Sequence, residues 1–322
     1  MARHALVGGP STALWRSTIR TPQFERTQPE VQQVDLSHRL RGLTRVGIGL
    51  SRAAVHGINS VARRLMRRTL GPAVFGELSV VRKALAGDHR GLLVDVGAHI
   101  GSSLDAFARD GWRVLAIEPD STNRAELVRC YGGFPNVRID PRAVGEGDGE
   151  LVTFYTSEVS SGISTLAPFH PSHRPTAEVE TVRLDSLLVH EREVTVLKTD
   201  LEGWDLMALR TFPWGRLHPR VVVSEFDDAK TTRLGYTFHD LAGFLVGCGY
   251  TVLVSEWLPV VEYGLQHEWR SIRTYPLALT DPAGWGNLIA VDPDLAPVIL
   301  RLAIAEGRRL RLRRLIGRAV AR

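Results

Sequence analysis

Short apolar segments alternate with helical patterns through the middle of the chain, and this alternation restricts the folds open to it. The apolar runs lie at 92–97, 113–118, 136–139, 194–199 and 220–226. The helical patterns lie at 102–110, 121–131, 203–211 and 237–248. Such alternation predicts a parallel sheet covered by helices on both faces.

The strand-like segments after residue 250 have no helical pattern between them, which predicts antiparallel rather than parallel pairing. The runs 250–263, 269–279 and 287–292 look like consecutive strands, so we expect an antiparallel edge to the sheet. Residues 149–156 and 178–184 are further strand candidates, bordering a polar loop at 157–177.

The ends of the chain are basic and its middle is acidic. Residues 1–70 hold twelve Arg against three acids, for +9, and 307–322 hold seven Arg and no acid, for +7, which leaves −11 for 71–306. An acidic body is poorly suited to neutralising nucleic-acid phosphates. The predicted organisation is a loose tail (1–35), a basic amphipathic helical extension (36–75), a catalytic domain (76–295) and a basic amphipathic helix (296–322).

Two cysteines, Cys130 and Cys248, give no disulfide framework, which indicates a reducing, cytoplasmic setting. No apolar run approaches the ~20 residues that span a bilayer, and the first residues lack the apolar core of a signal peptide. The C-terminal helix carries an apolar stripe of Leu312, Leu315, Ile316, Ala319 and Val320 among arginines. Such helices either pack on the domain or lie on the anionic inner face of a membrane, and both readings stay open.

The turn after the first apolar run reads DVGAHIG, a D-x-G-x-x-x-G pattern. A dinucleotide loop would read G-x-G-x-x-G, and here its middle glycine is missing. Asp95 would also repel a pyrophosphate, whereas it suits a ligand that carries an ammonium and a sulfonium. Gly97 and Gly101 let the backbone approach that ligand closely.

Glu118 ends the second apolar run, 21 residues beyond Gly97. A carboxylate at that place can accept hydrogen bonds from both hydroxyls of a ribose. The alternative is a plain turn acid before Pro119. An NAD-dependent oxidoreductase is the competing enzyme class, and the loop spacing disfavours it.

Three blocks, VDVGAHIG, AIEPD and VTVLKTDLEGWDLMAL, resemble those of the FkbM-type S-adenosylmethionine-dependent methyltransferases over roughly residues 90–292. The family's Lys-x-Asp-x-Glu-Gly run is matched by Lys198, Asp200, Glu202 and Gly203, while His99 stands where Asn is frequent. The resemblance implies a Rossmann-like class I methyltransferase fold, α/β, with a seven-stranded, mostly parallel sheet. It also implies S-adenosylmethionine as cofactor and O-methylation of sugars or natural products.

Carried over by position, the resemblance assigns a set of cofactor-binding residues. They are Asp95, Gly97, Ala98, His99, Gly101, Glu118, Pro119, Asp140, Ala143 and Val144. Around Asp140, a simple turn into a hairpin is the equal alternative.

Methyl transfer to a hydroxyl is helped by a base or a metal. Lys198, Asp200 and Glu202 alternate along an extended segment and should gather at its exposed end, unless Lys198 only forms a structural ion pair. His170 in a proline-rich loop, and His99 beside the glycine loop, are other candidate bases. Asp200 with Glu225 could hold Mg²⁺, or both could be solvated turn acids.

The predicted function is therefore S-adenosylmethionine-dependent methyl transfer to a hydroxyl of a sugar, glycolipid or secondary metabolite. The alternative from another class is a membrane-associated binding protein that keeps the fold without turnover.

Overall fold

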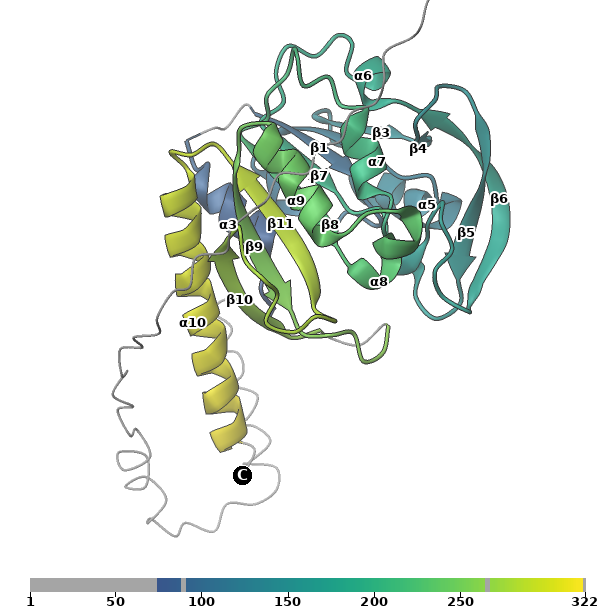
Figure 1. Ribbon diagram of the computed structural model, residues 1–322. Coiled ribbons are helices and arrows are strands. Elements are labelled where there is room, and N and C mark those ends of the chain that lie inside the picture. Colours follow the sequence, from purple (N-terminus) through teal and green to yellow (C-terminus); the bar gives the residue numbers. More distant parts are fainter. Residues whose placement is uncertain (1–73, 88–90, 264–266, 321–322) are drawn as a thin grey trace, which may run out of the picture. The chain divides into compact units, whose positions relative to one another are not determined.

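The computed structural model describes residues 74–87, 91–263 and 267–320. Within them, eight strands form one large sheet in the order β10-β9-β11-β8-β7-β1-β2-β3 (Figure 1). These strands are β1 (Leu92–Val96), β2 (Arg113–Ile117), β3 (Val137–Asp140), β7 (Val196–Thr199), β8 (Val221–Phe226), β9 (Thr251–Trp257), β10 (Trp269–Thr274) and β11 (Trp285–Val291).

The central strands are parallel, as the alternation predicts. β1 pairs in parallel with β2 on one side and with β7 on the other, and β7 pairs in parallel with β8. Every residue of β1 and of β8 is buried, because helices cover both faces, and this explains their nearly continuous apolar sequences. The carboxyl ends of these strands meet at one edge of the sheet, so the loops that follow them lie close together.

The other end of the sheet is antiparallel, as the segments without intervening helices predict. The described residues form eight strands in this sheet, matching the eight runs predicted from the sequence, whereas the resemblance implies seven. β11 lies inside the sheet, antiparallel to both β8 and β9, and β10 adds an antiparallel outer edge. β10 is retained because its Trp269 and Ile272 are buried, with Trp269 stacked on Phe75 at a ring distance of 4.2 Å.

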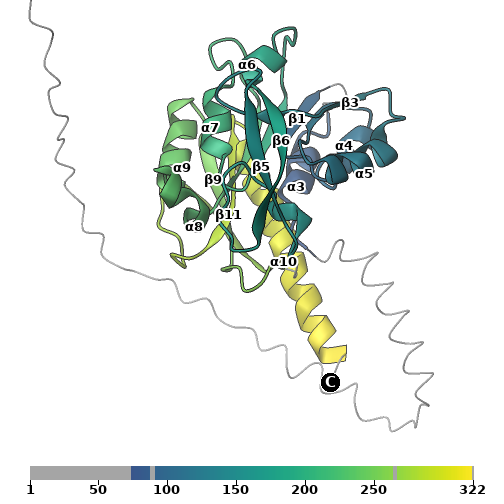
Figure 2. The ribbon, with the colours of Figure 1, turned by 90° about the vertical axis from the view of Figure 1, so that its right-hand side faces the viewer.

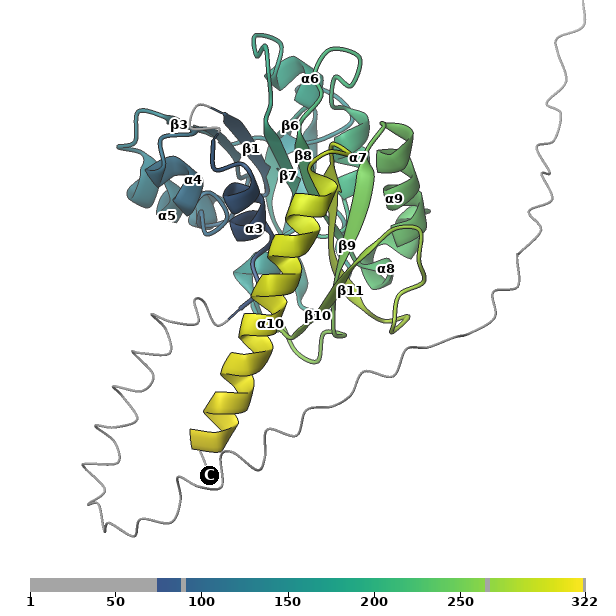
Figure 3. The same cartoon turned by 90° about the vertical axis from the view of Figure 1, so that its left-hand side faces the viewer.

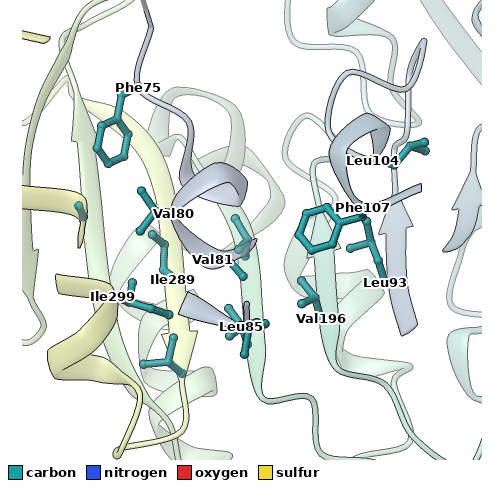
Figure 4. Close-up of a cluster of buried hydrophobic side chains, with 14 of the residues drawn as sticks. Phe75, Val80, Val81, Leu85, Leu93, Leu104, Phe107, Val196, Ile289 and Ile299 are labelled. Atoms are coloured by element: carbon teal, nitrogen blue, oxygen red, sulfur yellow. The ribbon is translucent and has the colours of Figure 1, made fainter. Parts of the chain in front are cut away.

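Two sets of helices cover the two faces. One face carries α3 (Glu77–Ala84), α4 (Asp105–Arg109), α5 (Ser121–Tyr131) and α10 (Ala296–Val320). The other carries α6 (Leu184–Leu187), α7 (Asp205–Arg210) and α9 (Phe238–Gly247), while α8 (Asp228–Thr231) and the short turns η1 (Ser161–Ile163) and η2 (Thr232–Leu234) lie in loops. Figure 4 shows the first core, where Val80, Phe107 and Ile299 pack with strand residues such as Val196 and Ile289.

A second, smaller sheet stands beside the large one. It has the order β4-β6-β5, formed by β4 (Ala143–Val144), β5 (Leu151–Ser157) and β6 (His173–Val182). β5 and β6 make an antiparallel hairpin that faces the viewer in Figure 2. The two predicted strands are confirmed, and β6 begins five residues earlier than expected, inside the segment predicted as loop.

The C-terminal segment forms a helix, α10, and the stripe that packs on the domain lies nearer its start than the apolar stripe noted in the sequence. α10 lies along α3 and β10 (Figure 3), with Ile299, Ala303 and Leu310 buried. Leu312 and Leu315 of the predicted stripe are 47% and 64% exposed. The packed stripe lies nearer the start of the helix, because only that part runs over the sheet.

No helix in the described part of the chain is long and apolar enough to cross a bilayer. The predicted tail (1–35) and nearly all of the predicted helical extension (36–75) lie outside the described residues.

Candidate functional site

The glycine loop after β1 packs tightly against the end of β7. Gly97 has a φ of 78°, and a Cβ at this position would lie 2.1 Å from the carbonyl oxygen of Asp200. The backbone N–H groups of Gly97 and Ala98 both donate to the carbonyl of Ile117, at 3.0 Å each. Glycine is therefore required at this position by both the backbone conformation and the space available.

Asp95 supports this loop from behind. It is completely buried, accepts from the Ser103 hydroxyl and lies 3.0 Å from Lys198 Nζ. Lys198 Nζ also donates to the carbonyl of Gly97 at 2.8 Å and lies 3.4 Å from Asp200 Oδ2. Burial alone would lower the pKa of Lys198, but the carboxylates of Asp95 and Asp200 outweigh it and raise the pKa. The predicted ion pair of Lys198 is thus present, and it fixes the loop.

Glu118 presents its carboxylate at the end of β2. Its Oε2 accepts from the backbone N–H of His99 at 2.7 Å, and its Oε1 accepts from that of Asp120 at 2.8 Å. Burial raises the pKa of Glu118 to about 7, against the lowering effect of these two hydrogen bonds. Asp120 in turn caps α5 by accepting from Thr122 and Asn123, which sets the start of that helix where the sequence predicts it.

These loops enclose a cavity with about 740 Å³ of empty space, part of it open to solvent, which we call the loop cavity. Six of the predicted cofactor-binding residues line it: Gly97, His99, Glu118, Pro119, Ala143 and Val144. The site prediction therefore converges on one cavity at the carboxyl ends of β1, β2 and β3.

Four predicted cofactor-binding residues lie elsewhere. Asp95 and Ala98 are buried beneath the loop, and Gly101 packs on Tyr131. Asp140 is turned toward Arg142, which donates to its two carboxylate oxygens at 3.0 and 2.8 Å. These four residues do not line the loop cavity. The side chains of three of them, and a Cβ placed at Gly101, contact other parts of the protein instead.

The remaining wall comes from residues that the sequence reasoning missed. They are Ile117, Asn123, Phe154, Ser161, Gly162, Ser164, Thr165, Leu166, Leu201 and Trp204. Most of them belong to the β5–β6 hairpin. The strands of this hairpin were predicted, but a single sequence does not indicate that the hairpin lies over the cavity. Trp204 could have been noted, because it directly follows the Lys-x-Asp-x-Glu-Gly run.

Trp204 also bears on whether a ligand fits this cavity. Its indole nitrogen is buried and has no hydrogen-bond acceptor among the described residues. A ligand with an acceptor group would satisfy this donor. The cavity thus combines a close-approach glycine, a carboxylate and an unmatched donor, as expected for S-adenosylmethionine with its ribose and amino-acid groups.

The predicted catalytic group divides into two. Asp200 lines the loop cavity with a side chain that is 43% exposed. Glu202 does not continue the same face, because its φ of 55° turns the backbone away from the extended conformation. Its carboxylate instead lies 2.6 Å from Lys230 Nζ, a residue that was not predicted.

Lys230 also determines whether the predicted metal site can bind a metal ion. Asp200, Glu202 and Glu225 each offer a carboxylate oxygen within 4.8 Å of the others. The ammonium of Lys230, however, lies 2.9 Å from Glu225 as well as 2.6 Å from Glu202, and so already pairs with two of these three carboxylates. Burial raises the pKa of Glu202 to about 7 and that of Glu225 well above its usual value. The cluster does not fit Mg²⁺ unless Lys230 is displaced.

The three histidines near the site differ in role. His99 lines the loop cavity, with Nε2 2.9 Å from the Ser161 hydroxyl. His170 does not line it, and its ring contacts Ser172 and Tyr263. The Nδ1 of His173 accepts from two backbone N–H groups, so Nε2 carries the proton and donates to the Ile163 carbonyl. His173 therefore braces the hairpin loop.

Comparison with solved structures finds several methyltransferases at low identity. The precorrin-6y C5,15-methyltransferase of Geobacter metallireducens is 15% identical, with 67% of this chain and 88% of that chain covered and a TM-score of 0.34. The 1,6-didemethyltoxoflavin-N1-methyltransferase of Burkholderia thailandensis, solved with S-adenosylhomocysteine, is also 15% identical, with 77% and 93% covered and a TM-score of 0.33. A TehB-like S-adenosylmethionine-dependent methyltransferase of Corynebacterium glutamicum is 13% identical, with 74% and 98% covered and a TM-score of 0.35.

A search of curated proteins finds no match. The family comparison is specific: the model of the methyltransferase FkbM domain matches residues 95–252. The match begins at the buried acid of the glycine loop and ends in β9, so it includes the loop cavity and the Lys198–Gly203 run. Residues 95–252 of the chain therefore form a methyltransferase FkbM domain.

Proposed function

We propose that the enzyme is an O-methyltransferase that acts on a hydroxyl of a sugar, glycolipid or secondary metabolite. The observation that carries this proposal is the position of Asp200, an exposed carboxylate at the rim of the loop cavity. A hydroxyl is a weak nucleophile, and a carboxylate within hydrogen-bond reach accepts its proton as the new bond forms.

Each wall of the cavity has a part in this reaction. Glu118 would hold the ribose hydroxyls, and Gly97 with His99 would border the amino-acid part. When bound, S-adenosylmethionine would supply a methyl group activated by its sulfonium, and the acceptor oxygen would take this group while the C–S electron pair remained on sulfur. Asp200 receives the proton and passes it to solvent. The remaining contribution of the chain is alignment, which lowers the entropic part of the barrier.

Calorimetric titration with S-adenosylhomocysteine, with NAD in a parallel cell, tests whether the protein binds the S-adenosylmethionine class of cofactor. We expect micromolar binding of S-adenosylhomocysteine alone. Binding of NAD alone would point to redox chemistry instead. Transfer of a labelled methyl group to hydroxyl compounds then tests the acceptor half, and cofactor binding without transfer to any hydroxyl would favour the alternative of a binding protein without turnover.

We also propose that the outer part of α10 contacts an anionic membrane surface. Ile304, Leu312 and Leu315 are exposed on the helix face opposite the packed stripe. Arg308 is exposed on that same face, and Arg309 and Arg311 flank it. Apolar burial combined with arginine attraction to anionic lipid is the usual basis of such interfacial binding.

Flotation with vesicles that contain phosphatidylglycerol, against vesicles of phosphatidylcholine alone, tests this contact. We expect binding to the anionic vesicles only, and loss of that binding in a Leu312→Asp, Leu315→Asp variant. Binding that the double substitution leaves intact would overturn the assignment to α10.

A further inference from the structure

A second opening lies on the other side of Asp200, between the start of α3 and the carboxyl ends of the central strands. It has about 830 Å³ of empty space, including open solvent, and we call it the α3 cleft. Its lining comprises Gly76, Glu77, Leu78, Ser79, Ser102, Ser103, Ala106, Phe107, Lys198, Asp200, Val223 and Asn287. Asp200 lines both openings, so it forms a wall between them.

We propose that the methyl acceptor binds in the α3 cleft, and that the cleft selects an acceptor group that is uncharged over the same group carrying a phosphate or sulfate. This inference rests on the proposed O-methyl transfer and adds to it the place of the second substrate and its charge. A ligand in the loop cavity and one in the α3 cleft would meet at Asp200, which is where the proton acceptor is needed.

The first argument is the state of Lys198, the cation that lines the α3 cleft. An ammonium group has three donors. Those of Lys198 face three oxygens: the Gly97 carbonyl at 2.8 Å, Asp95 Oδ1 at 3.0 Å and Asp200 Oδ2 at 3.4 Å. An anionic acceptor could use this cation only by competing with both Asp95 and Asp200, and loss of the pairing would leave the buried Asp95 carboxylate uncompensated.

The second argument is the negative charge around the cleft. Glu77 and Asp200 both line it, and a phosphate between two carboxylates is repelled by each. Burial raises the pKa of Glu77, while hydrogen bonds from Ser255 and Trp257 act in the opposite direction and favour its carboxylate form.

The third argument is that the cleft offers groups that bind hydroxyls. The hydroxyls of Ser79 and Ser102 have no hydrogen bond to another described residue, and both groups can donate as well as accept. Leu78, Phe107 and Val223 supply apolar surface beside them. A hydroxylated ring, polar at its edge and apolar on its faces, matches such a lining.

The cleft is also firmly built, which a selective site requires. Glu77 Oε1 accepts from the Ser255 hydroxyl at 2.7 Å and from the Trp257 indole at 2.8 Å. Ser255 in turn accepts from the indole of Trp269 at 3.0 Å. These bonds join the first turn of α3 to β9 and β10, so the cleft is preformed.

The test measures acceptor binding by saturation-transfer NMR on the full chain saturated with S-adenosylhomocysteine. The probes are methyl glycosides of common hexoses and the matching hexose 6-phosphates. Ser79→Arg places a cation with free donors in the cleft, and Ser79→Gln is its neutral control of similar length. Calorimetry with S-adenosylhomocysteine on each variant separates a failure of the cofactor half from a failure of this proposal.

We expect the unchanged protein to bind neutral glycosides and to bind the phosphates more weakly. Ser79→Arg should raise the preference for phosphate about tenfold, the effect of one charge-assisted hydrogen bond, while Ser79→Gln leaves it unchanged. Both variants should keep their affinity for S-adenosylhomocysteine. The proposal is overturned if the phosphates bind better than the glycosides, if no glycoside binds, or if Ser79→Arg leaves the preference unaltered.

Discussion

The loop cavity and the α3 cleft share Asp200 but are built in different ways. The loop cavity is bordered by the turns that follow β1, β2 and β3, so its polar residues are close in sequence to recognisable motifs. The α3 cleft is assembled from side chains of α3, α4, β7, β8 and β11, which are up to about two hundred residues apart. A motif can reveal the first kind of site, and only the folded sheet reveals the second.

The largest effect is expected from a substitution of Asp200, the residue that lines both openings. Asp200→Asn keeps the size of the side chain and removes its ability to take a proton. We expect kcat for methyl transfer to fall about 100-fold or more, because the hydroxyl loses its base. The Kd for S-adenosylhomocysteine should stay within about threefold of the original value. A comparable loss in both measurements would mean that Asp200 belongs to the loop cavity alone.

Gly97→Ala tests whether the loop cavity depends on close backbone approach. The added Cβ would meet the Asp200 carbonyl in a backbone conformation that already disfavours side chains. Strain of about 1–3 kcal/mol should weaken S-adenosylhomocysteine binding by roughly 10- to 100-fold, as measured by calorimetry. Gly149→Ala is the matched control, because Gly149 has a similar φ of 72° with open space around it. Equal effects in the two variants would show that φ strain alone matters.

Glu118 gives the loop cavity a pH dependence that the α3 cleft should lack. Its pKa is raised to about 7, so its carboxylate form is lost as the pH falls through that value. The affinity for S-adenosylhomocysteine should therefore decline as the pH is lowered from about 8 to about 6. Glu118→Gln should weaken binding at least about tenfold, or roughly 1.4 kcal/mol, and flatten this profile.

The same raised pKa affects folding with the opposite sign. The folded protein holds a proton on Glu118 more tightly than the unfolded chain does, so this group's contribution to stability is present at low pH and is lost as the pH rises toward about 7. Denaturant unfolding of the wild type and of Glu118→Gln across this range separates the two effects. A binding profile that followed stability would contradict the role given to Glu118.

A smaller effect is expected at Trp204, whose indole donor has no acceptor within the described residues. Trp204→Phe removes the N–H and keeps most of the ring. If the ligand satisfies this donor, affinity for S-adenosylhomocysteine falls about 2- to 10-fold, as for one hydrogen bond of about 0.5–1.5 kcal/mol. An unchanged or improved affinity would show that the donor stays unmatched in the complex.

The smallest effect is expected from metal removal. Because the Lys230 ammonium already lies between Glu202 and Glu225, where a metal ion would bind, methyl transfer should be unchanged after dialysis against EDTA. Lost activity that returns with added Mg²⁺ would show that the ion displaces Lys230. The assay is initial rates with and without the chelator.

Most of the elements around the loop cavity could be predicted from the sequence alone. The helix predicted at 121–131 is α5 with the same bounds, and in the structure Asp120 caps it by accepting from the backbone N–H groups of Thr122 and Asn123. The parallel strands were predicted from apolar runs, and β1, β2 and β8 differ by a residue or less at each end. Glu118 and Gly97 were found because each follows a strand at a spacing set by the ligand.

What the sequence could not predict depends on contacts between distant segments. Lys230 lies in a short helix after β8, and its role follows only from the close approach of Glu202 and Glu225. The turn of the backbone at Glu202, with φ at 55°, breaks an alternation that looked regular in sequence. The sequence left open whether the stripe at 312–320 packs on the domain, and it did not point to the stripe of Ile299, Ala303 and Leu310 that does so.

The β5–β6 hairpin has a consequence for how ligand reaches the loop cavity. It supplies much of one wall, yet its own apolar core is small, with Ala143, Phe154 and Val179 buried. Its loop is tied to the rest of the rim by polar contacts such as Ser161 with His99 and Arg233 with the carbonyl of Ala167, which water can replace. Segments with few apolar contacts open locally at low free-energy cost. Amide hydrogens of the hairpin should therefore exchange well before those of β1 and β8, and bound S-adenosylhomocysteine should slow their exchange while leaving the central strands unaffected.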